Sequence, residues 1–277
     1  MIKKYKPTTP GRRHYSVSDY SVLTTDEPFK KLTAFKKRRV GRSNGRITVR
    51  HKGGGNKKLY RSIFFGEEKK GIPGLVKTIE YDPNRSCFIS LISYEDGEWG
   101  YILSPQGIKV GDKIICDEKV AFKKGNRMML KNIPVGNFVH NVEVKSSAGG
   151  KLVKSAGSSA QVVAQDGKYT HLKMPSSEVR KIIDHYYASI GQLSNVEHKM
   201  ISIGKAGRSR HLGKRPKVRG TAMNAVDHPY GGGEGRTKRG TRRPKSIYGK
   251  VTGGKKTRKT KRYSNKFIVS KRKKKRK

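Results

Sequence analysis

The amino-acid sequence predicts an all-β protein that consists of two small barrels with long basic, largely irregular N- and C-terminal extensions. Three observations support this prediction. Positive charge is concentrated at the two ends of the chain, short apolar runs separated by turn signals fill the middle, and the last part is rich in glycine without hydrophobic periodicity.

The charge distribution separates a nearly balanced middle from two strongly basic ends. The chain of 277 residues carries 65 Lys or Arg and 20 Asp or Glu, a net charge of +45. Residues 1–60 hold 17 basic and 3 acidic residues, residues 61–200 hold 20 and 15, and residues 201–277 hold 28 and 2. Such an excess opposes compaction and indicates a large polyanionic partner. Nucleic acid is favoured over a membrane surface, because the sequence contains no long apolar run and no sustained amphipathic basic helix.

The middle of the chain is predicted to form β-strands. Asp96-Gly97 and Asp166-Gly167 each separate two apolar runs, and this dipeptide favours a hairpin because glycine accepts the positive φ of a primed turn. Strands at this spacing, without a convincing long helix, are typical of small barrels or sandwiches. The predicted strands cover residues 60–65, 74–81, 87–94, 99–103, 109–116, 138–144, 160–165, 168–174 and 178–183.

We therefore divide the chain into four parts. Residues 1–60 form a basic N-terminal extension, residues 61–125 a first barrel, residues 126–200 a second barrel, and residues 201–277 a basic glycine-rich C-terminal extension. From residue 201 onward there are 12 glycines and few large apolar side chains. This segment alone buries too little surface to offset its conformational entropy, so we expect it to become ordered only on its partner. Its end, KRKKKRK, is expected to be a disordered, solvated tail that makes only peripheral contacts with phosphates.

Two patterns that suggest metal or nucleotide sites have simpler explanations. Cys87 and Cys116 stand without a CxxC pair or a nearby histidine cluster, so we expect ordinary strand residues in a reducing compartment and no metal site. GKVTGGKKT (249–257) has Lys255 at the spacing of a P-loop lysine, but Lys256 replaces the required Ser or Thr. No strand is predicted before it and no helix after it, so nucleotide hydrolysis is excluded and no cofactor is expected.

Residues 45–61, GRITVRHKGGGNKKLYR, have the composition of a nucleic-acid contact. Gly53, Gly54 and Gly55 let the backbone approach phosphates, and their N–H groups can donate to phosphate oxygens. A flexible solvated loop is the alternative, but the second basic end repeats the same combination of glycines and cations. The expected cations are Arg46, Arg50, Lys52, Lys57, Lys58 and Arg61, and the rings expected to stack on bases are His51 and Tyr60.

VDHPYGGGEGR (226–236) places an aspartate beside a histidine, as in many acid–base sites. Side chains at neighbouring positions diverge, and catalytic pairs usually come from separate elements held by a rigid core. This segment is glycine-rich and lacks an apolar core, so it is a poor platform for positioning reactive groups. We expect His228 to lie against RNA instead, where it donates a hydrogen bond or holds a tight turn before Pro229.

Several strings resemble the family of bacterial-type large ribosomal subunit protein 2. The resemblance runs from PTTPGRRH (7–14) to NKFIV (265–269), which is nearly the whole chain. The strongest matches are PKVRGTAMNAVD (216–227) and the adjoining DHPYGGGEGR (227–236). Others, in the right order, are GRITVRHKGGGNKKLYR (45–61), YDPNRS (81–86), NIPVG (132–136), VHNVE (139–143), SAG (155–157) and GKAGRSR (204–210).

The resemblance implies an OB-fold for the first barrel, an SH3-like second barrel, and termini threaded into large-subunit ribosomal RNA. It implies roles in subunit assembly, in association of the two subunits and in the architecture near the peptidyl transferase centre. The partners would be this RNA, neighbouring ribosomal proteins and, across the interface, the small subunit. RNA carries peptidyl transfer in that system, so no enzymatic activity is expected, and His228 is carried over as a structural or supporting residue.

The chain departs from the family pattern at four positions. Tyr230 stands where a second histidine is usual, and Asn56 also replaces a histidine. Phe64 replaces an aspartate, and His211 replaces a tryptophan. These changes weaken any relay built on paired histidines but leave stacking and phosphate contacts intact.

The other residues expected to contact RNA lie in both extensions and in the YDPNRS string. In the N-terminal half they are Arg12, Arg13, Arg42 and Arg85. In the C-terminal extension they are Lys205, Arg208, Arg210, Arg215, Lys217, Arg219, Asn224, Asp227, His228, Gly231, Gly232, Gly233, Arg236, Lys255, Lys256 and Arg258.

Two other classes of protein compete with a structural RNA-binding protein. A DNA-compacting protein would share the charge but would need neither two barrels nor these strings. An enzyme centred on His228 would need a positioned partner that the segment does not offer. The basic start, MIKKYKPTTPGRRHYS, lacks the apolar core of a signal peptide. We therefore expect a cytoplasmic ribosome, with an organellar ribosome that uses an organelle-encoded copy as the alternative.

Overall fold

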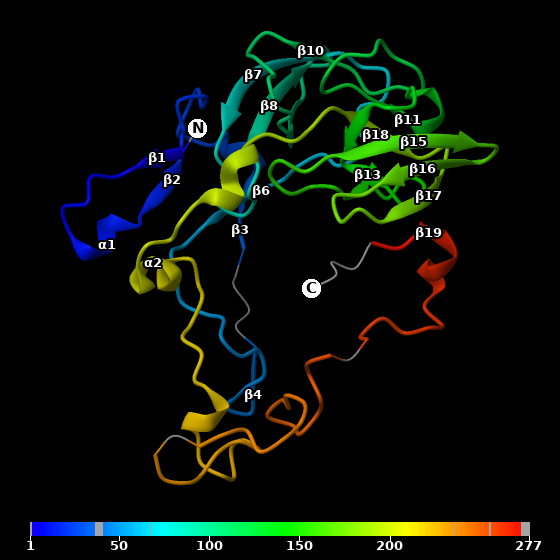
Figure 1. Ribbon diagram of the computed structural model, residues 1–277. Helices are drawn as coiled ribbons and strands as arrows, with labels where there is room; N and C mark the ends of the chain where they lie inside the picture. Colours follow the sequence, from blue (N-terminus) through cyan, green and yellow to red (C-terminus); the bar gives the residue numbers. More distant parts are fainter. Residues whose placement is uncertain (1, 37–40, 67, 236, 255, 273–277) are drawn as a thin grey trace. The chain divides into compact units, whose positions relative to one another are not determined.

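The computed structural model describes residues 2–36, 41–66, 68–235, 237–254 and 256–272. Short strands dominate it, and its helices are few and short (Figure 1). The chain divides into two compact units. The first unit comprises the described residues of Met1–Lys37, Lys57–Ala206 and Lys266–Lys277, and the second those of Arg38–Asn56 and Gly207–Asn265.

The first large sheet is antiparallel, with the strand order β10-β7-β8-β9. Its strands are β7 (Gly74–Glu80), β8 (Ile89–Tyr94), β9 (Trp99–Leu103) and β10 (Lys113–Ile114). Ile89 and Leu91 of β8 pack in one core, whereas Ile92 packs in another. Because β8 is covered on both faces, its apolar residues Ile89, Leu91 and Ile92 do not alternate strictly with polar ones. Gly97, with φ of 82°, closes the predicted hairpin between β8 and β9.

The second large sheet is also antiparallel and has the order β11-β18-β12-β15-β16-β17-β19. Ile133, Val139, Val162 and Leu172 are fully buried in its core. The Asp166-Gly167 turn joins β15 to β16, as predicted. The strands are β11 (Arg127–Met129), β12 (Phe138–His140), β15 (Ala160–Asp166), β16 (Tyr169–Lys173), β17 (Val179–Ile183), β18 (Tyr187–Ile190) and β19 (Ile268–Ser270).

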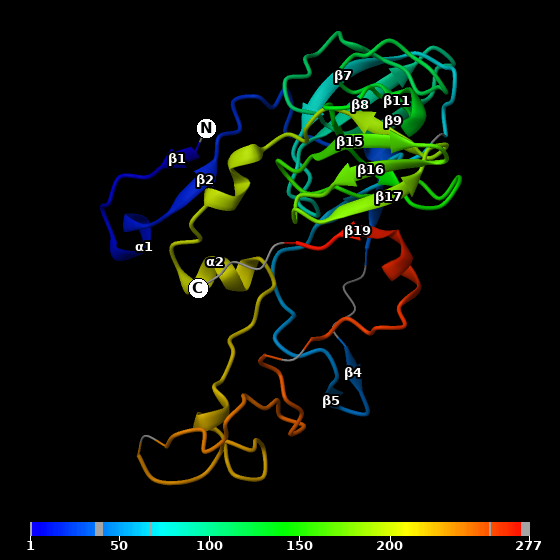
Figure 2. The same cartoon turned by 45° about the vertical axis from the view of Figure 1, so that its right-hand side comes forward.

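Three strands of this sheet, β11, β18 and β19, were not expected from the sequence. All four residues of β18 are buried, so the strand shows no polar alternation, and the small side chains of Ala188 and Ser189 weaken its apolar signal. β19 belongs to the C-terminal extension, yet it lies beside β17 (Figures 1 and 2), and its Ile268 pairs with Arg180. The expectation that the whole extension depends on a partner for order is therefore wrong at this strand, where an isoleucine and a valine favour sheet pairing.

The N-terminal extension is anchored by short elements. β1 (Ile2–Lys4) pairs with β2 (Ser16–Ser18), and α1 (Pro10–Arg13) lies in the connection between them. β3 (Thr33–Phe35) pairs with β6 (Leu59–Arg61), and β4 (Arg42–Ser43) pairs with β5 (Arg46–Ile47). The remaining elements are β13 (Val142–Glu143), β14 (Gly150–Leu152), α2 (Ala206–His211) and the 3-10 helices η1 (Lys30–Leu32), η2 (Leu130–Asn132), η3 (Val196–Met200), η4 (Gly220–Ala222) and η5 (Tyr263–Phe267).

The mostly β architecture confirms the predicted fold class. The boundaries at residues 60, 125 and 200 stay predictions, and Ala156 and Leu193 pack in the same core as Ile89 of the first sheet. Cys87 and Cys116 form no disulfide. Cys87 lies before β8 rather than within a strand, and burial raises the pKa of its thiol to about 11, so this thiol is a neutral packing group.

Candidate nucleic-acid interface

The glycine-rich basic segments from the two ends of the chain lie side by side in the second unit. The N–H of Arg215 donates to the carbonyl oxygen of His51 over 3.1 Å. The N–H of Gly53 donates to the carbonyl oxygen of Gly213, also over 3.1 Å. The ring nitrogen Nδ1 of His51 lies 3.2 Å from the carbonyl oxygen of Pro216. Two basic segments that lie far apart in the sequence therefore form one basic surface.

The local backbone explains why this surface requires glycine. Gly53, Gly54 and Gly55 have φ of 132°, 63° and 89°, a region that side chains with a Cβ rarely adopt. His51 is also left-handed, with φ of 60°. The N–H of Gly53 is engaged with Gly213, so the expected donation of this group to a phosphate does not apply.

Most of the expected cations of this surface are exposed. Lys52 forms an isolated antiparallel bridge with Lys214, a cation that is not among the predicted RNA contacts. Lys214 stands in the basic run GKRPKVR, so charge density alone could have indicated it. Arg208 is half-buried in α2. The exposed members are Arg42, Arg46, Arg50, Lys52, Arg210, Lys214, Arg215, Lys217 and Arg219.

A second basic cluster forms in the first unit, where the two extensions meet. The N–H of Ser202 donates to Oγ of Ser16 over 2.8 Å. A Cβ on Gly11 would lie 3.6 Å from Cδ of Lys205, so the lysine passes close to α1. Arg12 and Arg13 of α1 and Lys205 are exposed. This contact brings together cations that are far apart in the sequence.

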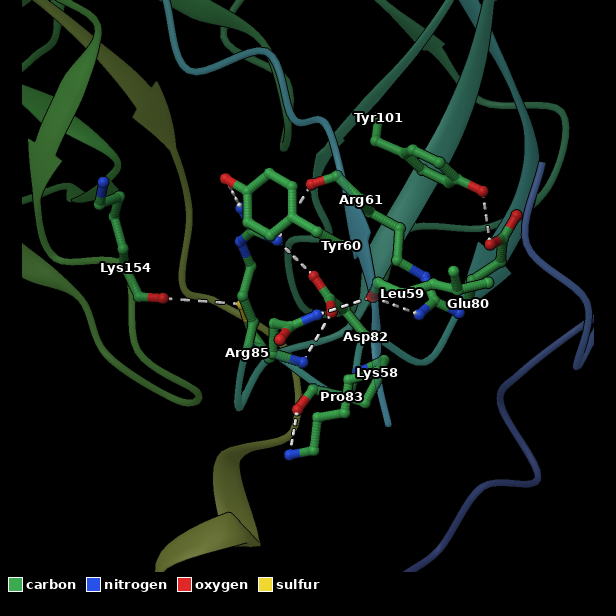
Figure 3. Close-up of polar contacts among 12 residues, drawn as sticks. Lys58, Leu59, Tyr60, Arg61, Glu80, Asp82, Pro83, Arg85, Tyr101 and Lys154 are labelled. Atoms are coloured by element: carbon green, nitrogen blue, oxygen red, sulfur yellow. Dashed lines mark hydrogen bonds and ion pairs between the residues drawn. The ribbon is translucent and has the colours of Figure 1, made fainter. Parts of the chain in front are cut away.

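Arg85 is held by a network on the first barrel region (Figure 3). Its guanidinium pairs with the fully buried carboxylate of Asp82 and donates to the Tyr60 hydroxyl over 3.2 Å. The guanidinium also lies 5.1 Å from the centroid of the Tyr60 ring and 5.5 Å from that of Phe65. Arg85 and Tyr60 therefore have partners within the protein, and their contact with RNA stays a prediction.

Arg61 of β6 and Lys58, which precedes this strand, also contact the protein itself (Figure 3). Arg61 is only 6 % exposed and donates to the carbonyl oxygen of Leu59 over 3.2 Å. The ammonium of Lys58 donates to the carbonyl oxygen of Pro83 over 2.8 Å. Lys57 is exposed. Of these three expected contacts, Lys57 is thus the one whose side chain is most accessible to a partner.

His228 is buried in a tight turn of the second unit. Nδ1 of its ring accepts the N–H of Tyr230 over 3.1 Å, and its carbonyl oxygen accepts the N–H of Gly231 over 2.8 Å. A Cβ on Gly220 would lie 2.5 Å from the imidazole, so the ring packs directly on backbone. Asp227 is exposed, and the ring takes its hydrogen bond from Tyr230 rather than orienting on that carboxylate. This geometry favours the turn-holding alternative for His228.

The three glycines after Tyr230 are required either because another part of the backbone lies too close for a Cβ or because φ is positive. A Cβ on Gly231 would lie 2.1 Å from the carbonyl oxygen of Asn224. Gly232 and Gly233 have φ of 85° and 88°, and the N–H of Gly232 donates to Met223. Asn224 itself is exposed. The loop is thus compact without a large apolar core.

The last expected contacts lie near the C-terminus. Arg236 and Lys255 are outside the described residues. Lys256 and Arg258 are exposed, and Arg258 donates to Oδ1 of Asn265 over 2.6 Å. Within the described parts of the chain, no group of three or more His, Cys, Asp or Glu side chains could hold a metal ion. None of the described helices is long and apolar enough to cross a membrane.

Two β regions that carry glycine-rich segments with exposed arginines and lysines define a structural protein that binds a polyanion. Comparison with known families identifies the polyanion as RNA. Residues 29–116 match the RNA-binding N-terminal domain of Ribosomal Proteins L2, and residues 123–249 match the C-terminal domain of the same family. The chain belongs to the ribosomal protein L2 family. It is a structural RNA-binding protein of the large ribosomal subunit and not an enzyme.

Proposed function

We propose that the surface formed by residues 41–56 and 207–219 is the main contact with large-subunit ribosomal RNA. The observation that carries this proposal is the backbone pairing of His51 with Arg215 and of Gly53 with Gly213. This pairing gathers exposed cations from both basic ends on one surface. Phosphate neutralisation by these cations supplies affinity, and the glycines let the backbone approach the RNA.

The cluster of Arg12, Arg13 and Lys205 would be a separate RNA contact on the first unit. The barrel regions would add contacts that depend on RNA shape, because double-stranded RNA is recognised largely through its backbone. Neighbouring ribosomal proteins and the small subunit are further proposed partners. We also propose that the protein supports subunit assembly, subunit association and the architecture near the peptidyl transferase centre, with His228 as a structural residue there.

The proposal predicts a steep dependence of RNA affinity on salt. Each phosphate contact contributes roughly 0.7–0.9 to the slope of log affinity against log salt concentration, so about ten contacts give a slope near −8. The slope is measured by filter binding of the full chain to large-subunit RNA at salt concentrations from roughly 50 to 200 mM. Over this range the affinity of a protein with several phosphate contacts falls measurably. A flat dependence would contradict the electrostatic account.

Matched variants locate the contact on this surface. Lys52→Gln should weaken RNA binding and reduce the slope by roughly 0.7–0.9. Lys109→Gln is the control, because Lys109 is exposed but lies on the first barrel region, outside both basic clusters. Equal effects of the two substitutions would show that charge acts without a defined surface. A preference for duplex DNA over ribosomal RNA in competition would favour a DNA-compacting protein.

The site of action within the cell is part of the same proposal. We infer a cytoplasmic ribosome, with an organellar ribosome as the alternative. Co-sedimentation of the tagged chain with large subunits from each cell fraction discriminates between them.

A further inference from the structure

The second unit is organised around two buried side chains. Among its described residues, His228 and Tyr230 are the buried ones, each 9 % exposed. Their ring centroids lie 5.0 Å apart. The N–H of Tyr230 donates to His228, so the two rings and one backbone hydrogen bond form a small hub in a segment that otherwise lacks a core.

The Tyr230 hydroxyl ties the hub to a segment further along the chain. It accepts the backbone N–H of Lys245 and lies 3.4 Å from the carbonyl oxygen of Arg243. Oγ1 of Thr241 lies 3.3 Å from the same hydroxyl and 3.0 Å from the Arg243 carbonyl oxygen. One phenolic oxygen therefore connects the turn that follows His228 with residues 241–245.

The tethered segment continues into a hairpin-like loop. The N–H of Ser246 donates to Lys250 over 2.8 Å, and the N–H of Thr252 donates to Pro244 over 2.8 Å. Lys245 also forms an isolated bridge with Val251. The hydroxyl thus holds the base of a loop from residue 241 to residue 252, and this loop presents the basic side chains Arg242, Arg243, Lys245 and Lys250.

We propose that Tyr230 is a positioning residue that preforms the basic loop 241–252 for RNA binding. The proposal deepens the proposed function and rests on it, but it adds a second RNA-contacting loop that the expected contact residues do not include. A loop that is ordered before binding loses less conformational entropy on the RNA, so its cations give more net affinity. The phenol supplies no positive charge, and the phosphate contacts come from the loop that it holds.

The test compares Tyr230→Phe with Tyr263→Phe in the full chain. Both substitutions remove one phenolic oxygen and leave a ring in place, but Tyr263 is 73 % exposed and lies outside the loop 241–252. Losing one or two hydrogen bonds, at about 1 kcal/mol each, corresponds to a change of about fivefold to thirtyfold. We expect the Kd for large-subunit RNA to rise by that factor in Tyr230→Phe and to stay unchanged in Tyr263→Phe.

The salt dependence separates positioning from direct contact. In Tyr230→Phe the slope of log Kd against log salt should equal that of the wild-type chain, because no phosphate contact has been removed. In Arg242→Gln the slope should fall by roughly 0.7–0.9. A slope in Tyr230→Phe that falls by a similar amount would overturn the proposal, as would an unchanged Kd.

A measurement without RNA tests the hub itself. Hydrogen exchange of residues 241–252, followed by mass spectrometry on the free chain, should be at least about fivefold faster in Tyr230→Phe than in Tyr263→Phe. Amides of the first large sheet provide an internal reference. Equal exchange in both variants would refute preformation, whereas failure of the proposed RNA contact would appear as a flat salt dependence of the wild-type chain.

Discussion

Protonation of His140 should destabilise this protein in mildly acidic solution. His140 is 2 % exposed at the end of β12. Its Nδ1 lies 2.9 Å from the carbonyl oxygen of Gly191, which can only accept, so Nδ1 carries the proton of the neutral ring. Burial, with a smaller contribution from the Arg127 guanidinium, lowers the pKa of His140 from 6.5 to about 4.

The sign and size of the effect follow from linkage. Between pH 6.5 and about 4 the unfolded chain binds a proton at His140 that the folded chain does not. Stability therefore rises with pH through this window and is lost as the solution is acidified. A difference of 2.5 in pKa, 6.5 less 4, corresponds to about 3 kcal/mol of unfolding free energy between the two ends of the window.

Urea unfolding followed by circular dichroism at several pH values measures the effect. His140→Asn retains an N–H group near the position of Nδ1 but cannot be protonated, so its stability should depend less on pH by about 3 kcal/mol across the window. Burial raises the pKa of Glu80, which makes stability fall as pH rises, but this contribution is common to both chains and cancels in the comparison. His14→Asn alters an exposed histidine and is the control. Equal pH dependence of His140→Asn and the wild-type chain would refute the reasoning.

Two further predictions concern Asp82 and Gly220. Asp82→Asn leaves the guanidinium of Arg85 without its buried counter-ion, so the free energy of unfolding measured in urea should fall by about 3 kcal/mol. Asp96→Asn changes the more exposed pair with Lys69 and should lower the same free energy by less than about 1 kcal/mol. A similar cost for both substitutions would contradict the role assigned to burial. Gly220→Ala places a Cβ 2.5 Å from the His228 ring, so hydrogen exchange at Tyr230 should accelerate by about fivefold or more as the ring is displaced. The control is Gly207→Ala, because a Cβ at this position meets nothing within 4 Å. Faster exchange at Tyr230 in the control as well would indicate a general effect of alanine on the second unit.

Much of the fold was predictable because local signals and tertiary packing agree. β9 has the predicted bounds, and β7, β15, β16 and β17 lie within about a residue of theirs. Of the strand predicted at residues 109–116, the structure forms only β10 (Lys113–Ile114). Periodicity failed at β18, whose residues are buried on both faces, and at β19, whose partner strand lies far away in the sequence. A short strand of this kind is defined by its partner more than by its own residues.

Part of the candidate RNA-binding site was likewise predictable from the sequence, and part was not. Composition alone indicated a polyanion partner, because a net charge of +45 depends on residue counts and not on conformation. The glycine triplet at 53–55 also predicted a backbone that can approach phosphates closely, and its positive φ angles require glycine. Burial and pairing could not be known from residue types. Arg61 and Arg85 matched the expected pattern of RNA contacts, yet both are engaged in the first barrel region.

By itself the sequence determined the class of partner, the β architecture and the positions at which glycine is needed, since each depends on properties carried by single residues or short runs. Tertiary structure decided which cations share a surface, which are engaged within the protein, and how a segment without an apolar core is held. The backbone pairing of His51 with Arg215 and the hydroxyl of Tyr230 beside Lys245 are contacts between residues separated along the chain. Such contacts exist only after loop closure, so no local pattern encodes them.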